Sequence, residues 1–446
     1  MENRIFIGDL KQYSGKSVTI GAWVDVRRDQ GKMVFFDFRD MSGTVQGVVL
    51  PKSGAMDTAK ELRQMYTVAV TGIVNQRPEK NAQQDKQNGD IELQIEEIPI
   101  LNVAAPLPFD LGAELHLETH LDHLPLTLRT QRSRDIFTMQ ASILDAYRNS
   151  LRKQDFTEFV APSLVGSDSE GGGAVFKVEY FNETSAYLAV SPQLYKQIMV
   201  GPFERAFTVA KIFRAEKSAT TRHLSEATCM DFEMGFVESE REPMKVLENA
   251  VRDTVKAVGE KHPDIFKRFN TSVPMVPDEI PILTLAEAHD ILGVPHEPDM
   301  EPEHERNICA WAKENKESDF VFITRFPTAK RAFYTYEDPS EAPLSRGFDL
   351  LFRGLEINSG AQRIHDHDQL VAKMKSRGLD PSKFFFYLQA FKYGMPPHGG
   401  SSTGLERFTA RMLEIPNVKE ATAFPRDMTR IDSRLSEAPE FDPQQK

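Results

Sequence analysis

Hydrophobic and polar residues alternate with a period of two in the first hundred residues, and this pattern predicts a small all-β domain. The β-rich runs are residues 18–27, 34–39, 44–50, 68–74 and 91–96, separated by glycine and polar stretches. One helical segment, residues 55–66, falls between the third and fourth runs. Three strands, a helix and two more strands is the order of an OB-fold, a partly open barrel that binds single-stranded nucleic acid.

The expected binding face of this barrel carries aromatic, amide and basic side chains. Phe35 is suited to stack on a base, Gln46 to read a base edge, and Arg28, with Arg27, to contact phosphate. Phe36 follows Phe35 directly and must point to the opposite side, so one of the two belongs to the barrel core. We favour base stacking for Phe35, and a core position remains the alternative.

After residue 104 the spacing of the apolar residues no longer follows a period of two. Residues 105–130 contain two closely spaced prolines, Pro106 and Pro108, and predict a hinge. A helix is expected at residues 132–153, because apolar residues recur there every three or four positions. A strand that ends near Pro162 follows it. The stripe on the helix fits either a homodimer interface or the core of one chain. Its residues are Ile136, Met139, Ile143, Tyr147 and Leu151.

Residues 347–363 predict a hairpin of two short strands. Alternation places Asp349 on one face of the first strand, and it puts Glu356 and Asn358 together on one face of the second. At the floor of a cleft, Asp349 and Glu356 would raise each other's pKa unless a cation lay between them. A hard divalent ion that also binds phosphate oxygens would meet that need, and Arg363 could grip a substrate carboxylate. The alternative is an ordinary charged hairpin edge.

Two clusters and a glycine-rich loop carry further candidate chemistry. Residues 191–199, SPQLYKQIM, place Gln193 and Lys196 on one side of a helical turn. A glycine-rich loop at residues 169–176 carries Glu170, which could bind an ammonium group. Residues 207–236 predict a strand, a basic loop and a returning strand that together suit a nucleoside triphosphate. Solvated charge patterns are the alternative for each cluster. The charged residues of the last one are Arg214, Glu216, Arg222 and His223.

Composition narrows the class of protein. The chain has 446 residues, enough for two or three domains, and a net charge of −12. That charge argues against indiscriminate nucleic-acid binding, so a specific partner needs a local basic or aromatic surface. No apolar run of bilayer length occurs, so we expect a cytoplasmic protein with no membrane partner. The acidic, histidine-bearing run at residues 296–306 is interpreted as a solvated loop.

Several motifs resemble those of the class II aminoacyl-tRNA synthetases. The segment that contains FRAE, a loop and RHLSEA resembles motif 2 of that class. GLERF at 404–408 resembles motif 3, and the helix and strand that end at Pro162 resemble motif 1. Within the class, the archaeal and eukaryotic aspartyl-tRNA synthetases are most similar, in SPQLYKQ, RGFDLLFRGLEINSGAQRIH, FKYGMPPHGG and FPRD. The resemblance covers almost the whole chain.

The resemblance implies an α+β protein with two domains. An N-terminal OB-fold β-barrel at residues 1–104 would bind the anticodon. A hinge at 105–130 would lead to a class II catalytic domain at 131–446, an antiparallel sheet flanked by helices, with an inserted helical subdomain at about 271–330. The implied activity is ATP-dependent conversion of L-aspartate to aspartyl-adenylate and its transfer to tRNA-Asp, by a homodimer.

The resemblance also implies roles for the candidate residues. Arg214 and Arg407 would be the catalytic arginines, and Asp349 and Glu356 would bind Mg²⁺. The implied ATP-binding residues are Arg214, Glu216, Arg222, His223, Glu356 and Arg407. The implied aspartate-binding residues are Glu170, Ser191, Gln193, Lys196 and Arg363. The implied anticodon-binding residues are Asp25, Arg28, Phe35, Gln46 and Glu92.

Two departures from the family pattern leave alternatives open. Ser402 stands where motif 3 usually has a glycine, and Asp25 occupies a position thought to influence discrimination between tRNA-Asp and tRNA-Asn. The sequence therefore leaves open whether tRNA-Asn is charged as well. An asparagine–tRNA ligase is a second hypothesis. A catalytically silent tRNA-binding paralogue is a third, although such a protein would be expected to lack the catalytic arginines or the metal-binding carboxylates, all of which are present.

Overall fold

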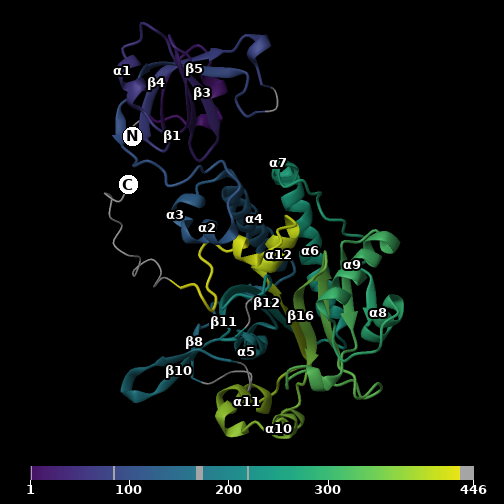
Figure 1. Cartoon of the computed structure of the whole chain (residues 1–446). Coiled ribbons are helices and arrows are strands. Elements are labelled where there is room, and N and C mark those ends of the chain that lie inside the picture. The colour runs from purple at the N-terminus through teal and green to yellow at the C-terminus, as the bar shows by residue number, and fades with distance from the viewer. Residues whose placement is uncertain (2, 84–85, 167–173, 218–219, 432–446) are drawn as a thin grey trace. The chain divides into compact units, whose positions relative to one another are not determined.

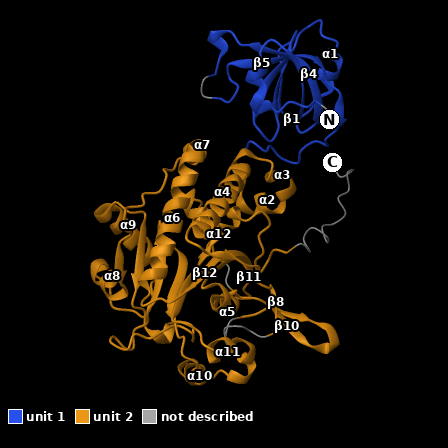
Figure 2. Ribbon diagram, turned by 180° about the vertical axis from the view of Figure 1, so that it is seen from behind, with its two compact units in different colours: residues 1–113 blue, residues 114–446 orange. Residues whose placement is uncertain are grey.

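The computed structural model describes residues 1–446 except 2, 84–85, 167–173, 218–219 and 432–446. The chain divides into two compact units, Met1–Ala113 and Glu114–Lys446, which Figure 2 colours separately. Among the residues described, none of the helices combines the length and the apolar character needed to span a bilayer.

The first unit is a β-barrel. Its sheet has the strand order β1-β2-β3-β5-β4-β6, and β1 also pairs with β4, which closes the barrel. Helix α1 (Met56–Glu61) lies between β3 and β4, so the predicted OB-fold is confirmed. Two short 3₁₀ helices, η1 (Ile7–Tyr13) and η2 (Glu79–Asn81), complete the unit. The strands are β1 (Ser17–Asp29), β2 (Val34–Arg39), β3 (Thr44–Val49), β4 (Thr67–Gln76), β5 (Ile91–Glu97) and β6 (Ile100–Asn102).

The second unit is built on an eight-stranded sheet with the order β13-β14-β15-β16-β17-β12-β11-β7. Neighbouring strands are antiparallel except at its two edges, where β7 runs parallel to β11 and β13 parallel to β14. The expected antiparallel sheet flanked by helices is therefore confirmed. Its strands are β7 (Thr157–Glu158), β11 (Arg205–Phe213), β12 (Glu226–Gly235), β13 (Ile282–Thr284), β14 (Phe320–Thr324), β15 (Gly347–Phe352), β16 (Leu355–Arg363) and β17 (His398–Gly404).

Three helices cover one face of this sheet: α4 (Gln131–Lys153), α6 (Arg241–Lys261) and α12 (Leu405–Met412) (Figure 1). The apolar stripe of α4 is at most 2 % exposed and belongs to the same core as Phe232 of β12 and Phe348 of β15. The core of one unit thus accounts for the stripe, which is not available as a dimer surface.

The other face of the sheet carries polar side chains and is flanked by α5 (Gln193–Phe203). This helix packs with α10 (His367–Ser376) and α11 (Phe385–Lys392) in a separate apolar cluster. A small sheet of β8 (Leu164–Val165), β10 (Ser185–Leu188) and β9 (Lys177–Glu179) precedes α5 in the chain. The polar face of the sheet is therefore the floor of a site that α5 borders.

The remaining elements connect these layers. The segment expected as an inserted helical subdomain holds α8 (Leu285–Leu292) and α9 (Pro302–Lys316), and it also contributes β13 and β14 to the main sheet. The segment expected as a hinge contains α2 (Leu117–Asp122) and α3 (Leu124–Thr127). Helix α7 (Pro263–Arg268) follows α6. Short 3₁₀ helices are η3 (Phe181–Glu183), η4 (Thr328–Lys330), η5 (Pro381–Phe384) and η6 (Val418–Ala421).

The predicted hairpin is present as β15 and β16, but one of its faces differs from expectation. Leu351 pairs with Glu356 and Leu350 pairs with Asn358, with a register shift between the two pairs. Because directly paired residues share a face, Glu356 lies on the face of Asp349 whereas Asn358 lies on the opposite, core face. The expectation that Glu356 and Asn358 share a face is therefore wrong, since a β-bulge inserts one extra residue between them.

Candidate active site

A cavity of about 150 Å³ brings together most of the residues predicted to bind a nucleotide. It lies between the β11–β12 loop, β16 and the start of α12. Arg214 and Glu216 follow the end of β11 rather than lying within it, and Glu216 is exposed and not part of the cavity lining. The predicted residues that line the cavity are Arg214, Arg222, His223, Glu356 and Arg407.

A carboxylate from α9 fixes one side of this cavity. Both oxygens of Glu305 accept hydrogen bonds from Arg222 Nη2, at 2.6 and 2.8 Å, and Glu305 also accepts from the backbone N–H of Glu356 at 3.1 Å. Arg407 Nη1 donates to the Glu356 carbonyl oxygen at 3.0 Å. Glu305 is buried and part of a helix, so the interpretation of residues 296–306 as a solvated loop is wrong at this position. Its partner comes from a distant loop, which no local pattern indicates.

One of the two hairpin carboxylates, Asp349, is already paired with a cation of the chain itself. Arg331 grips Asp349 with both terminal nitrogens, at 2.9 and 2.7 Å, and also donates to the Ser359 hydroxyl at 3.1 Å. Loss of hydration, followed by the charge of Asp349, raises the pKa of Glu356 to about 7. The direction is the one expected for two crowded carboxylates. Arg331 was not predicted from the sequence, because it stands in a segment without a recognisable motif.

These oxygen donors fit a magnesium ion that substrate phosphates would help to hold. In the described part of the chain, no cluster of three or more histidine, cysteine, aspartate or glutamate side chains is arranged to hold a metal ion without further ligands. Mg²⁺ commonly binds proteins through one or two carboxylates, with phosphates and water supplying the other oxygens. Asp349 and Glu356 are two carboxylates of the kind that such a site would need.

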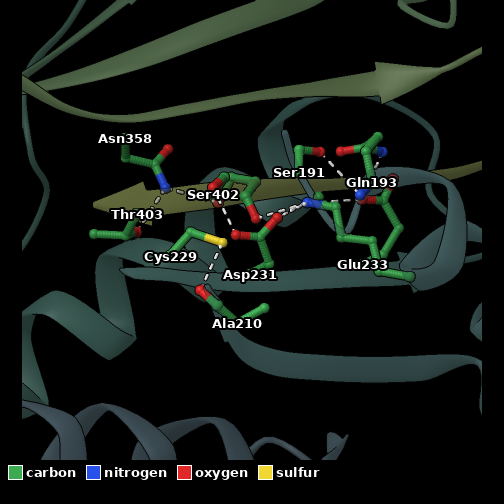
Figure 3. A network of polar contacts seen from close by, with 12 residues as sticks. Ser191, Gln193, Ala210, Cys229, Asp231, Glu233, Asn358, Ser402 and Thr403 are labelled. Atoms are coloured by element: carbon green, nitrogen blue, oxygen red, sulfur yellow. Dashed lines mark hydrogen bonds and ion pairs between the residues drawn. The ribbon is translucent and has the colours of Figure 1, made fainter. Parts of the chain in front are cut away.

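A buried cluster of four charged side chains lies beside the cavity, since Asp231 of this cluster pairs across the sheet with Ser402, which lines the cavity. Figure 3 shows Asp231 and Glu233, the two carboxylates of the cluster. Lys196 of α5 is fully buried, and its Nζ lies 2.9 Å from Asp231 and 3.4 Å from Glu233, both on β12. Arg363 Nε donates to Glu233 at 2.9 Å, and its Nη2 donates to a β17 carbonyl oxygen at 2.9 Å. Glu233 therefore joins the two cations that were predicted to hold the substrate carboxylate.

The other predicted aspartate-binding residues border this cluster where the structure describes them. Gln193 accepts a hydrogen bond from Arg363 Nη2 at 3.4 Å and donates to Glu233 at 3.5 Å. The Ser191 hydroxyl accepts from the backbone N–H of Gln193 at 2.9 Å and shapes the start of α5. Glu170 lies outside the described residues. Lys196, Arg363 and Gln193 thus converge on Glu233, and Ser191 contacts Gln193.

The counter-charges of the cluster were not identified from sequence. Asp231 and Glu233 alternate with apolar residues on β12, and carboxylates at that spacing in an apolar strand are a signal that could have located them. Burial alone would raise the pKa of Glu233, but the charges of Arg363 and Lys196 outweigh it and lower this pKa. Ser402, the departure in motif 3, donates to Asp231 at 2.6 Å and so supports the carboxylate that binds Lys196.

A buried histidine closes the far side of the cluster. Burial lowers the pKa of His398 to about 4, so the ring is neutral at physiological pH. Its Nδ1 must donate to the Pro396 carbonyl oxygen at 2.9 Å, which leaves Nε2 to accept from the amide of Gln197 at 2.8 Å. The other end of that amide accepts from the Tyr387 hydroxyl at 3.1 Å. Tyr387 belongs to α11, which thus borders the pocket.

The first unit presents its predicted nucleic-acid-binding residues on one outer face of the barrel. Arg28 pairs with Phe35 across β1 and β2, and Asp37 pairs with Gln46 across β2 and β3. Arg28 grips Asp37 through both terminal nitrogens, at 2.8 and 2.7 Å. Gln46 donates to Glu92 at 3.3 Å. The predicted phosphate-binding arginine is therefore paired with a carboxylate in this state.

Two details of this face follow from its strand geometry. Of the adjacent phenylalanines, Phe36 is fully buried in the barrel core, whereas Phe35 is half-buried on the outer side. Asp25 lies at a register shift of β1 and accepts a hydrogen bond from Arg39 Nε at 3.1 Å. A bulge changes the direction of the side chains next to it, and the Asp25 side chain is directed toward Arg39 of β2.

The barrel and the polar site on an antiparallel sheet define the class of protein. A family model described as tRNA synthetases class II (D, K and N) matches residues 116–428, and a model of the OB-fold nucleic acid binding domain matches residues 18–101. The chain belongs to the class II tRNA synthetase family, and it is an aminoacyl-tRNA ligase.

Individual relatives are similar over nearly the full length. The chain is 40 % identical to the aspartate–tRNA(Asp/Asn) ligase of Thermus thermophilus, covering 96 % of this chain and 99 % of that one. It is 38 % identical to the aspartate–tRNA(Asp) ligase of Thermococcus kodakarensis, over 94 % and 97 %. Among solved structures, asparaginyl-tRNA synthetase from Pyrococcus horikoshii, complexed with asparaginyl-adenylate, matches with a TM-score of 0.89, 30 % identity and coverage of 97 % and 100 %.

Proposed function

We propose that this chain is an aspartate–tRNA ligase, which activates L-aspartate with ATP and transfers the aspartyl group to the 3′ end of tRNA-Asp. The observation that carries the proposal is the buried pair of cations, Lys196 and Arg363, beside an arginine-lined cavity. A pocket with two buried cations suits an amino acid whose side chain is a carboxylate. Relatives at 40 % and 38 % identity that are named aspartate–tRNA ligases support the same assignment.

In this proposal, Arg363 and Lys196 bind the β-carboxylate of aspartate. The bonds that Arg363 makes to other described side chains use Nε and Nη2, so its Nη1 is the donor that faces the substrate. Ser191 and Gln193 line the position of the α-amino group, for which the family resemblance also implies Glu170. Bound asparagine would present an amide to Arg363 Nη1 in place of a carboxylate, so a charge-assisted hydrogen bond is lost and the cost of desolvating the pocket is not repaid.

The cavity arginines then bind and orient ATP. Arg214 holds the α-phosphate and Arg407 the γ-phosphate, Arg222 and His223 contact the phosphates from the loop, and Glu216 contacts the adenine end. The aspartate α-carboxylate attacks the α-phosphorus and pyrophosphate leaves. The 3′-hydroxyl of the terminal adenosine then attacks the adenylate carbonyl, and AMP leaves. Catalysis rests on positioning and on stabilisation of developing charge rather than on a protein nucleophile.

Asp349 and Glu356 would hold Mg²⁺ in this scheme. The ion, when bound, would neutralise charge on the phosphate oxygens. Without the ion, Arg331 neutralises the charge of Asp349. The ion would therefore bind either after this ion pair has weakened or through carboxylate lone pairs that are not hydrogen-bonded to Arg331. The donor set is hard oxygen, as Mg²⁺ prefers.

The barrel would bind the anticodon loop, and the enzyme would act as a homodimer. Phe35 would stack on a base, Gln46 would read the middle base, Glu92 would lie near the first, Arg28 would contact phosphate, and Asp25 would influence the choice of tRNA. The edge strand β7 supports a dimer, because Val160, just beyond it, is 96 % exposed and an uncovered edge favours association.

Parallel charging assays test the proposal. Purified enzyme is given labelled aspartate with tRNA-Asp and with tRNA-Asn, and the proposal requires that tRNA-Asp is charged. Relatives named for tRNA(Asp) alone and for tRNA(Asp/Asn) are about equally similar, so the second arm of the assay decides whether tRNA-Asn is also a substrate. No charging of tRNA-Asp with aspartate would overturn the proposal.

The likeness to an asparaginyl-tRNA synthetase, with a TM-score of 0.89, supports one alternative, an asparagine–tRNA ligase. ATP–pyrophosphate exchange separates the two functions before any tRNA is needed. Exchange that depends on aspartate and not on asparagine supports the proposed enzyme, and the reverse result establishes the alternative.

A further inference from the structure

Helix α11 has two faces of different character. Its inner face is buried against α5 and α10. Its outer face carries large aromatic side chains in solvent: Phe385 and Phe386 are each 69 % exposed, and Tyr393, directly after the helix, is 78 % exposed. With 100° between successive helical residues, these three lie within one third of the helix circumference. The outer face therefore carries three exposed aromatic rings, two at the start of the helix and one just beyond its end, which together are called the patch.

The segment that carries this patch is positively charged although the protein is acidic. Residues 381–393 contain two lysines, Lys383 and Lys392, and neither aspartate nor glutamate, whereas the whole chain has a net charge of −12. Lys392 Nζ lies 5.9 Å from the centroid of the Tyr393 ring. A local basic and aromatic surface of this kind is what an acidic protein needs to bind a nucleic-acid strand.

The patch is also close to the amino-acid pocket, where the proposed transfer of the aspartyl group to tRNA takes place. The inner face of α11 contacts the amino-acid pocket, since Tyr387 donates to Gln197 at 3.1 Å and the Phe391 ring lies 5.8 Å from the ring of His398. A helix with its side chains is about 10–12 Å across. The patch therefore lies about one helix width from the pocket. Figure 1 shows α11 next to α5, the helix that borders the pocket.

We propose that the outer face of α11 binds the unpaired 3′-terminal nucleotides of the tRNA. The aromatic rings would stack on bases, and Lys392 would contact the phosphate backbone. This face offers flat rings, an amide and an ammonium group, without exposed aliphatic side chains, which suits base stacking better than docking of a protein partner. The inference rests on the proposed function, because the tRNA 3′ end is the group that must reach the adenylate. The face consists of Phe385, Phe386, Gln389, Lys392 and Tyr393.

A comparison of intact tRNA-Asp with tRNA-Asp that lacks its 3′-terminal CCA tests this inference. The full-length variant Phe386→Ala/Tyr393→Ala should bind intact tRNA about tenfold or more weakly than wild type, since each lost stack weakens binding severalfold. Its affinity for truncated tRNA should equal that of wild type. Aspartate-dependent ATP–pyrophosphate exchange should be unchanged, because the substituted side chains are exposed and do not line the pocket.

Two controls sharpen the comparison. Phe181→Ala removes a ring that is 77 % exposed elsewhere in the same unit and should leave tRNA binding unchanged. Lys392→Ala should reduce the slope of log affinity against log salt by about one for intact tRNA and not for truncated tRNA.

Retention of the full preference for intact tRNA in the double variant would overturn the inference. So would the absence of any such preference in wild type. A fall in molecular mass of the double variant in sedimentation, with tRNA affinity unchanged, would show that the patch joins two copies instead. Failure of the proposed function has a different signature, namely the absence of aspartate-dependent exchange in wild type.

Discussion

Glu233 is the single residue on which the amino-acid pocket depends most. It is fully buried and lies within ion-pair distance of both Lys196 and Arg363, so neither cation is without a counter-charge. Asp231 completes a cluster of two cations and two carboxylates. Removing one member leaves a buried charge unpaired, which costs about 3–5 kcal/mol of stability. Loss of binding and loss of folding must therefore be separated in any experiment on this pocket.

Arg363→Leu should abolish aspartate-dependent ATP–pyrophosphate exchange, because the fork that binds the substrate carboxylate is lost. The variant Arg363→Leu/Glu233→Gln removes the opposing charge as well, so it should regain stability in urea unfolding but not activity. Recovery of exchange in the double variant would show that Arg363 serves the fold and does not bind substrate.

Because His398 is neutral in the folded protein, the free energy of unfolding should decrease at acid pH. Its pKa is about 4 in the folded protein, below the 6.5 of an exposed histidine. Between these values the unfolded chain binds the proton and the folded chain does not, so stability is fully present above pH 6.5 and is lost as pH falls toward 4. This single group should account for about 3 kcal/mol.

Urea unfolding between pH 4 and 8 measures this effect. Of the two tryptophans, Trp23 lies in the first unit and Trp311 in the second, so a Trp23→Phe background reports on the catalytic unit through Trp311. His398→Gln keeps a side chain that can donate and accept but cannot titrate. The prediction fails when the variant loses as much stability as its parent over this pH range.

At the scale of elements, β16 lies in the middle of the sheet and tolerates no added bulk at Gly360. A Cβ atom there would lie 2.3 Å from the Phe348 ring and 2.6 Å from Ser401 Cβ. Gly360→Ala should therefore destabilise the catalytic unit by about 1–3 kcal/mol through overpacking. Gly201→Ala is the matched control, since a Cβ on that helix α5 residue meets nothing within 4 Å. Thermal unfolding of both variants checks the pair, and equal melting temperatures would contradict the argument.

Element patterns also show how much could be predicted from sequence. Alternation was sufficient for five of the six strands of the barrel and for the hairpin, because a surface strand repeats with period two, whereas the short strand β6 was not predicted. It was not sufficient for Asn358, because one bulge residue inverted the faces of the strand beyond it. Lys196 and Arg363 belong to recognisable motifs, whereas Glu305 and Arg331 act through partners far away in the chain and have no local signature.

At the scale of the whole molecule, the two units divide the labour that the proposal assigns to the chain. All residues proposed for adenylate formation lie in Glu114–Lys446, and all those proposed for the anticodon lie in Met1–Ala113. Adenylate formation needs no tRNA. A substitution on the binding face of the barrel should therefore impair tRNA charging but not adenylate formation. Measuring both activities tests this division more sharply than measuring loss of charging alone.

Phe35→Ala should raise the KM for tRNA-Asp in charging by about tenfold, since one base–aromatic stack contributes about 1–3 kcal/mol, and it should leave aspartate-dependent exchange unchanged. Phe6→Ala is the control within the same unit: its ring is 39 % exposed, but it precedes β1 and does not belong to the binding face. If both variants charge tRNA normally, Phe35 contributes only to the barrel. If Phe35→Ala also loses exchange while its circular dichroism is unchanged, the two units are coupled in activation and the division of labour is wrong.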